Sequence, residues 1–138
     1  MTRRYMLDTN TVSYIIKDKS PASRAKLANL PHGEIACISA ITEAELQYGI
    51  AKNLKGTVIR PAVEAFCARI QVLPWGREEA QAYGGLRAKL EAQGKVLGNL
   101  DMLIAAHAIS VGAILVTNDK AFQQVADLPA TVNWATEL

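Results

Sequence analysis

The sequence has 138 residues, of which half are hydrophobic and 20% are charged, and its formal net charge is only +2. This length and composition fit one globular domain over residues 1–138 and exclude a disordered chain. No apolar run approaches the roughly 20 residues of a membrane-spanning helix, and Asp8 ends the N-terminal apolar run too early for a signal peptide. The interpretation is a single-domain cytoplasmic protein.

Short apolar strands alternate with helical patterns along the chain. In chain order we expect a strand at 5–7, helices at 11–17 and 20–30, a strand at 35–39, helices at 42–55 and 58–70, and a strand at 71–73. Helices at 78–93 and 102–110, a strand at 113–117, a short helical turn after Asp119 and an edge strand at 131–134 follow. Strands alternating with helices predict an α/β fold built on a parallel sheet.

The ends of several elements carry their own signals. Ser20 can cap the second helix and Pro21 suits its first turn. Gly94 and Gly112 are natural residues for ending the two long C-terminal helices. The strands are short and mostly lack polar alternation, which is typical of strands covered on both faces. Cys37 and Cys67 form no CxxC pair and lie in apolar stretches, so we expect reduced thiols in a reducing compartment.

Four acids occupy related places in this pattern. Asp8 ends the first strand, Glu45 lies in the first turn of the helix after the second strand, and Asp119 follows the strand at 113–117. Asp101 opens the helix near 102, after a loop. The carboxyl ends of parallel strands share one edge of the sheet, where ligands bind. The sequence therefore places three of the acids at that edge, with Asp101 inferred to join them.

Each acid taken singly has a local alternative. Asp8, Asp101 and Asp119 suit helix caps or first-turn positions, and Glu45 could close a capping box on Thr42. Convergence changes the balance, because two like charges about 4 Å apart repel by about 4 kcal/mol at an effective dielectric near 20. A cation removes that repulsion. Oxygen ligands without a Cys/His set of zinc-like spacing favour Mg²⁺ or Mn²⁺, and His107 is better explained as a core or helix-surface histidine.

At these residues the sequence resembles the PIN-domain ribonucleases, specifically the VapC-type toxins of VapBC toxin–antitoxin pairs. The segments that carry the resemblance are MLDTN at 6–10, ISAITEAELQYG at 38–49, GNLDMLIAAHA at 98–108 and LVTNDKAF at 115–122. Each is weak alone, but the four in this order span nearly the whole chain. The family's acids match Asp8, Glu45, Asp101 and Asp119, with Glu43 a poorer match than Glu45 and the last position the least constant.

The resemblance implies a three-layer α/β/α PIN-like fold with a mainly parallel sheet of four to five strands. It also implies endoribonuclease activity that depends on Mg²⁺, with Mn²⁺ able to substitute, directed at structured RNA and above all at transfer RNA near the anticodon. We expect Asp8, Asp101, Glu45 and Asp119 to hold one or two ions, which would neutralise phosphate charge and activate water. Matching polar positions are Thr9, Asn10, Thr117 and Asn118, of which Asn10 and Thr117 are candidates to hold the carboxylates by hydrogen bonds.

Two kinds of partner are expected. Nine acids outside the site face 15 basic residues, so the remaining surface is basic enough to attract RNA. Candidate contacts are Arg87, Lys89 and Lys95, although a solvated helix face explains them equally simply. The resemblance further implies a homodimer and a hetero-oligomer with a VapB-type antitoxin. The apolar faces at 20–30 and 58–70 are explained either by core packing or by a groove for an antitoxin helix.

Three alternatives stay open from the sequence. Asp8-Thr9-Asn10-Thr11 loosely resembles the DxDxT loop of aspartyl-nucleophile phosphatases, although Asn10 replaces the general acid. A non-catalytic PIN-like binding module would keep the fold without the chemistry. A DNA-directed metal nuclease would use the same carboxylates on another substrate.

Overall fold

The computed structural model describes residues 3–52 and 56–136. Its strands are β1 (Arg3–Leu7), β2 (Glu34–Ser39), β3 (Gln71–Leu73), β4 (Ile114–Val116) and β5 (Thr131–Val132). Its helices are α1 (Thr9–Ile16), α2 (Pro21–Ala28), α3 (Ala40–Lys52), α4 (Gly56–Arg69), α5 (Arg77–Ala92) and α6 (Asn99–Val111), with a 3₁₀ turn η1 (Lys120–Gln124). Every element expected from the sequence is present, so the α/β prediction is confirmed.

The element boundaries differ from the expected ones mainly at helix starts. α3 begins at Ala40 and α6 at Asn99, earlier than the expected 42 and 102, because the Ser39 hydroxyl accepts from the Ile41 amide in the first turn of α3 and Gly98 is the N-cap of α6. Residues 53–55 at the expected end of the third helix lie outside the described residues. The edge strand ends at Val132, and Trp134 instead buries its ring beside Tyr5.

Three of the expected helix signals, Ser20, Pro21 and Gly112, act as predicted. The Ser20 side chain accepts a hydrogen bond from the Ser23 amide at 3.3 Å, and Pro21 occupies the first position of α2. Gly112 ends α6 with φ +67°, a left-handed conformation that glycine adopts without strain. These caps fix where the helices end and hence where the loops between them begin.

The five strands form one sheet in the order β3-β2-β1-β4-β5, and all neighbouring strands are parallel. The chain first builds outward from β1 through β2 to β3, and then crosses to the other side of β1 to add β4 and β5. The direction of building therefore reverses between β1 and β4. In open parallel sheets the crevice for ligands lies at such a reversal, outside the carboxyl ends of the strands.

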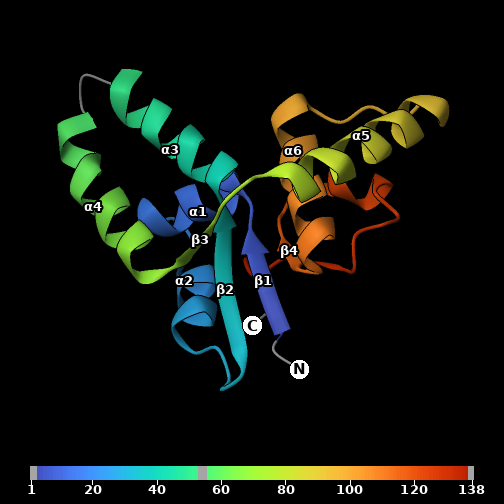
Figure 1. Ribbon diagram of the computed structural model, residues 1–138. Coiled ribbons are helices and arrows are strands. Elements are labelled where there is room, and N and C mark those ends of the chain that lie inside the picture. Colours follow the sequence, from blue (N-terminus) through green and yellow to red (C-terminus); the bar gives the residue numbers. More distant parts are fainter. Residues whose placement is uncertain (1–2, 53–55, 137–138) are drawn as a thin grey trace.

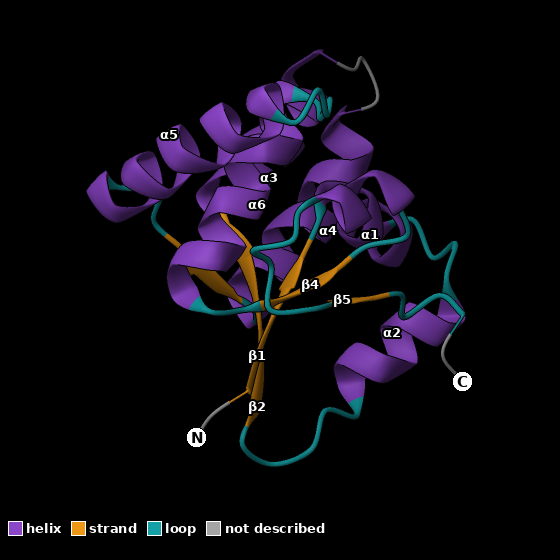
Figure 2. Ribbon diagram, turned by 90° about the vertical axis from the view of Figure 1, so that its right-hand side faces the viewer, coloured by secondary structure: helices purple, strands orange, loops and turns teal. Residues whose placement is uncertain are grey.

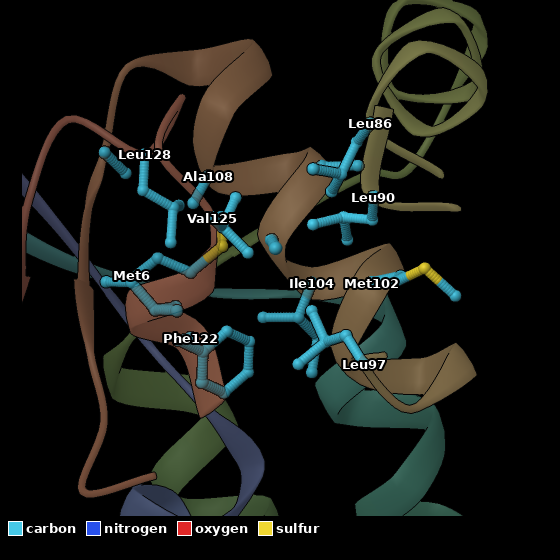
Figure 3. Packing of buried hydrophobic residues seen from close by; sticks show 14 of the residues in the cluster. Met6, Leu86, Leu90, Leu97, Met102, Ile104, Ala108, Phe122, Val125 and Leu128 are labelled. Carbon is cyan, nitrogen blue, oxygen red and sulfur yellow. The ribbon is translucent and has the colours of Figure 1, made fainter. Parts of the chain in front are cut away.

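Helices cover both faces of the sheet (Figure 1). Successive strand residues point to opposite faces: Met6, Cys37 and Leu115 pack in one core with α5, α6 and η1. The residues that follow them on the same strands, Leu7, Ile38 and Val116, pack in a second core with α1, α3 and α4. The architecture is a three-layer α/β/α sandwich, as predicted. Figure 3 shows the first core, in which the side chains of Met6, Phe122 and Ile104 pack together.

Both cysteines are free thiols, as expected. Cys37 is fully buried, and burial raises the pKa of its thiol to about 12. Across the described part of the chain, no helix combines the length and the apolar character needed to cross a lipid bilayer.

Candidate active site: the carboxylate edge

Asp8 and Asp119 flank the reversal point of the sheet. Asp8 directly follows β1 and caps α1, and its Oδ1 accepts a hydrogen bond from the Thr11 amide at 2.9 Å. Its own amide donates to the Val116 carbonyl at the end of β4, so the two strand ends are tied together here. Asp119 begins η1, and its Oδ1 accepts from the Ala121 amide at 2.9 Å. Both acids therefore do cap helices, and they also lie at one edge.

Glu45 does not close the capping box that the sequence permits. Because α3 begins at Ala40, Glu45 lies in its second turn rather than the first, out of place for a cap. The Glu45 carboxylate instead accepts a hydrogen bond of 2.7 Å from the hydroxyl of Thr9, just past the end of β1. The buried Thr42 hydroxyl lies 3.3 Å from the same Thr9 oxygen. This contact turns Glu45 towards the end of β1.

Asp101 is electrostatically coupled to the other three acids. It lies in the first turn of α6, which is not directly continuous with any strand. Its pKa is raised above the ordinary value, first by burial and then by the negative charges of Asp119, Asp8 and Glu45. Only carboxylates in mutual range can act on one another in this way. The structure thus brings all four acids to one edge, including the one that the sequence placed only by inference.

The four carboxylates are near one another without forming a finished ligand shell. Among residues 3–52 and 56–136, no three His, Cys, Asp or Glu side chains are already arranged around a common metal position. Coulomb coupling reaches beyond the roughly 2–2.6 Å of an oxygen–metal bond, so the two observations agree. Asp8, Glu45 and Asp119 each use one oxygen in a local hydrogen bond.

The supporting polar residues act differently from the expectation. Asn10 is exposed on α1, and no hydrogen bond joins it to a carboxylate among the described residues. Thr117 accepts from the backbone amide of Asp119 at 3.0 Å rather than donating to a carboxylate. Neither Asn10 nor Thr117 donates to a carboxylate among the described residues, and their part in holding the acids stays a prediction. Thr9 is the supporting residue that does donate a hydrogen bond to a carboxylate, that of Glu45. Asn118 is exposed.

A buried hydrogen bond links the helices that carry Glu45 and Asp101. His107 on α6 is fully buried, and its Nδ1 lies 2.7 Å from the Ser39 hydroxyl at the end of β2. Ser39 also accepts from the Ile41 amide in the first turn of α3. Burial lowers the pKa of His107, although nearby Glu79 acts in the opposite direction. His107 is a core histidine, as expected, but its bond to Ser39 was not anticipated.

The three basic residues proposed to contact RNA already have acceptors within the protein. Arg87 and Lys89 lie on α5, and Lys95 follows it. Their partners are, in the same order, Glu91 at 2.9 Å, Asp127 at 2.8 Å and the Gln124 carbonyl at 3.4 Å. All three pairs are at or near the surface, where such contacts are weak. A role in RNA binding stays a prediction, and it would require phosphates to compete with these partners.

The chain matches known proteins over nearly its whole length. The PIN domain family model covers residues 5–128. Ribonuclease VapC2 of Haemophilus influenzae is 40% identical over 132 residues, which is 95% of this chain and 98% of that protein. The tRNA(fMet)-specific endonuclease VapC of Shigella flexneri is 40% identical over 133 residues, 96% of this chain and 98% of its own.

A solved structure gives the same result. The structure of VapBC2 from Rickettsia felis bound to a promoter DNA fragment contains a chain that superposes with a TM-score of 0.89 at 36% identity, covering 95% of this chain and 98% of that one. The loop at Asp8-Thr9-Asn10-Thr11 is therefore explained by this family and not by a phosphatase. The protein belongs to the PIN-domain family and, within it, to the VapC-type ribonuclease toxins.

Proposed function

We propose that the protein is a toxin endoribonuclease that hydrolyses RNA with divalent metal ions held by Asp8, Glu45, Asp101 and Asp119. The observation that carries the proposal is the gathering of acids at the carboxyl edge: the Asp8 amide binds the Val116 carbonyl at the end of β4, and Thr9, just past β1, donates to Glu45. The charges of these acids and of Asp119 also act on Asp101 and raise its pKa. Four carboxylates gathered at one edge repel one another unless a cation offsets their charge. Family membership supplies the reaction class.

The donor set suits Mg²⁺, with Mn²⁺ as a substitute. All four candidate ligands are carboxylates, and hard oxygen ligands favour these ions over zinc. An ion bound here neutralises phosphate charge and makes water a better nucleophile at neutral pH. The chain's own part is to hold the carboxylates: the Thr9 hydroxyl orients Glu45, and backbone amides of Thr11 and Ala121 orient Asp8 and Asp119.

Asp8 and Asp101 are the proposed direct ligands, and Asp8 is only 3% exposed. Such a buried carboxylate, fixed by the Thr11 amide, offers an oxygen at a defined position with little entropy left to lose. Glu45 orients the attacking water, and Asp119 supports a second ion or the outer shell. The His107–Ser39 hydrogen bond keeps α6 in register with the start of α3.

The proposed substrate is a structured RNA cut in an exposed single-stranded loop, near the anticodon of a transfer RNA. A site at the edge of a sheet can admit an extended strand, whereas the deep groove of an A-form duplex is closed to side chains. Relatives from Shigella flexneri and Salmonella typhimurium, 40% and 38% identical, are named tRNA(fMet)-specific endonucleases. This tRNA is therefore the first substrate to test.

The proposed inhibitor is a VapB-type antitoxin whose amphipathic helix fills an apolar groove. The groove, of about 800 Å³, lies between α1, α2 and α4 and reaches the starts of β2 and β3. Its apolar walls include Leu27, Leu30, Phe66 and Ile70. A helix with apolar residues on one face suits such walls, and the similar solved chain comes from a VapBC2 structure. We further propose a homodimer as the unit that binds the antitoxin, which light scattering of the toxin alone and with antitoxin would test.

The decisive experiment compares the wild-type protein with Asp8→Asn on tRNA(fMet) in Mg²⁺, with and without EDTA. Cleavage should require the metal and fall by at least about 100-fold in the variant. Glu45→Gln should also lose activity, whereas Glu43→Gln, a neighbour on the same helix, is the matched control. Mn²⁺ binding followed by calorimetry should weaken in Asp8→Asn independently of turnover.

Each alternative has its own result. Cleavage that resists EDTA would remove the metal requirement, and equal activity of Asp8→Asn would remove the site. Preference for single-stranded DNA over RNA would assign the protein as a DNA-directed nuclease. Mn²⁺ binding without cleavage of any nucleic acid would point to a binding module.

A further inference from the structure

A small polar recess opens directly beside Asp119. Its volume is about 180 Å³, and its walls come from the turn after β4, from η1 and from the segment around β5. Segments distant in the sequence thus meet here, because β4 and β5 pair in parallel. Figure 2 shows the C-terminal segment returning alongside β4 to bring these walls together. The recess lies at the same edge of the sheet as the four carboxylates.

Three side-chain amides line the recess, together with the hydroxyls of Thr117 and Thr131, the Asp119 carboxylate and the Lys120 ammonium. The amides are those of Asn118, Gln123 and Asn133. The Asn133 Oδ1 accepts from the Ala135 amide at 3.0 Å, and its NH₂ group has no hydrogen-bond partner in the part of the chain that the structure describes. Within the described residues, the amides of Asn118 and Gln123 form no hydrogen bond at all. The recess therefore presents both donors and acceptors to whatever enters it.

The size of the recess restricts its occupant. A volume of about 180 Å³ is below the roughly 300–1,000 Å³ of pockets for drug-sized ligands. It equals the liquid share of about six water molecules at ~30 Å³ each. One flat aromatic ring fits this space, whereas a peptide helix or a duplex does not. The apolar Val132 in the wall offers contact to a ring face.

We propose that this recess binds one nucleobase of the RNA next to the cleaved bond and sets the sequence preference of the nuclease, an inference that rests on the proposed function. Amide side chains pair in a bidentate way with base edges, and an unstacked base in a single-stranded loop exposes those edges. Lys120 lines the same recess, is exposed and forms no ion pair among the described residues. It is placed to contact the adjoining phosphate, whose charge is the same for every base.

The test uses four short RNAs that differ only in the base beside the cut, together with the same series carrying a CH₂ group in place of the bridging oxygen of the scissile bond, which blocks hydrolysis. Wild type should prefer one base, by about 5- to 100-fold in kcat/KM and in affinity. Gln123→Ala and Asn133→Ser should each bring that ratio close to 1. Serine at 133 can still accept the Ala135 amide, so the turn is preserved.

Lys120→Ala provides the internal contrast, and Gln47→Ala on the exposed face of α3 is the matched control. Lys120→Ala should weaken the binding of all four RNAs equally and reduce the salt dependence of binding. Gln47→Ala should leave the ratio between the bases unchanged. An unaltered ratio in both Gln123→Ala and Asn133→Ser would overturn the recess proposal while leaving the nuclease intact. Absence of any base preference in the binding series would overturn it as well, even if wild type cuts no RNA.

Discussion

The two ends of the sheet carry opposite chemistries. At the carboxyl ends of the strands, four acids and a polar recess of about 180 Å³ lie together. At the amino ends of β2 and β3, an apolar groove of about 800 Å³ lies between helices. The parallel topology gathers the loops that follow the strands at one end and the loops that precede them at the other. One small domain can therefore place its chemistry and its proposed control on separate surfaces.

The largest expected effect comes from a substitution that changes only the carboxylate end of the sheet. Asp101→Asn should lower RNA cleavage by about 100- to 1,000-fold, since it removes a proposed ligand. It should also raise the melting temperature without added metal, because it removes a charge that the other three acids repel. Initial rates and thermal unfolding measure the two effects. A variant that loses both activity and stability would show that Asp101 has a structural role only.

The next effect tests the groove. Ala62→Glu places a charge among apolar walls, which should weaken antitoxin binding by about 2 kcal/mol, or roughly 30-fold. Ala88→Glu on the exposed face of α5 is the matched control. Titration calorimetry with the purified antitoxin measures the affinity, and RNA cleavage by the toxin alone reports on the other end. Equal affinities of the two variants would place the antitoxin elsewhere.

A smaller effect concerns the hydrogen bonds of Glu79, in the first turn of α5. Glu79 accepts from the Ser110 hydroxyl and the Gly76 amide, and these bonds lower its pKa. Glu79→Gln should cost about 1.5–3 kcal/mol of unfolding free energy at pH 7. Urea unfolding measures it, with Glu78→Gln, the exposed neighbour, as control.

The shifted pKa values of His107 and Glu79 predict a pH dependence of stability. The pKa of His107 is lowered, so the unfolded chain binds a proton more readily, and stability should fall as pH drops below about 6.5. The lowered pKa of Glu79 adds a further loss as pH drops below about 4.5. In His107→Asn the first loss should disappear while the second remains. A stability that stays flat from pH 7 to 5 in the wild type would contradict this.

The smallest expected effect is a difference in thiol reactivity between Cys37, in the middle of the sheet, and Cys67 on α4. Cys37 is fully buried with a thiol pKa of about 12, whereas Cys67 is half-buried on α4. Only thiolates react readily with disulfide reagents. The folded protein should expose at most one slowly reacting thiol, Cys67, and both after unfolding in urea. Fast reaction of Cys37 would mean that the sheet opens more often than its packing indicates.

The sequence by itself determined the order of strands and helices and the positions of Asp8 and Asp119. Both follow from local patterns: short apolar runs between caps, with an acid where a strand stops. For His107 it left a core place and a helix-surface place open, and the structure buries the residue fully. The start of α3 was misjudged, since Thr42-Glu43-Ala44-Glu45 fits a capping box that the helix, already begun at Ala40, does not use.

Only the tertiary structure decided how the parts of the edge meet. Asp101 joins the other acids because α6 packs on the sheet, not because of any signal near 101. The contacts Thr9–Glu45 and Ser39–His107 join residues far apart in the chain. The groove and the recess likewise need walls from several elements. Local sequence encodes backbone preference and burial, whereas the pairing of distant side chains depends on strand order and helix packing.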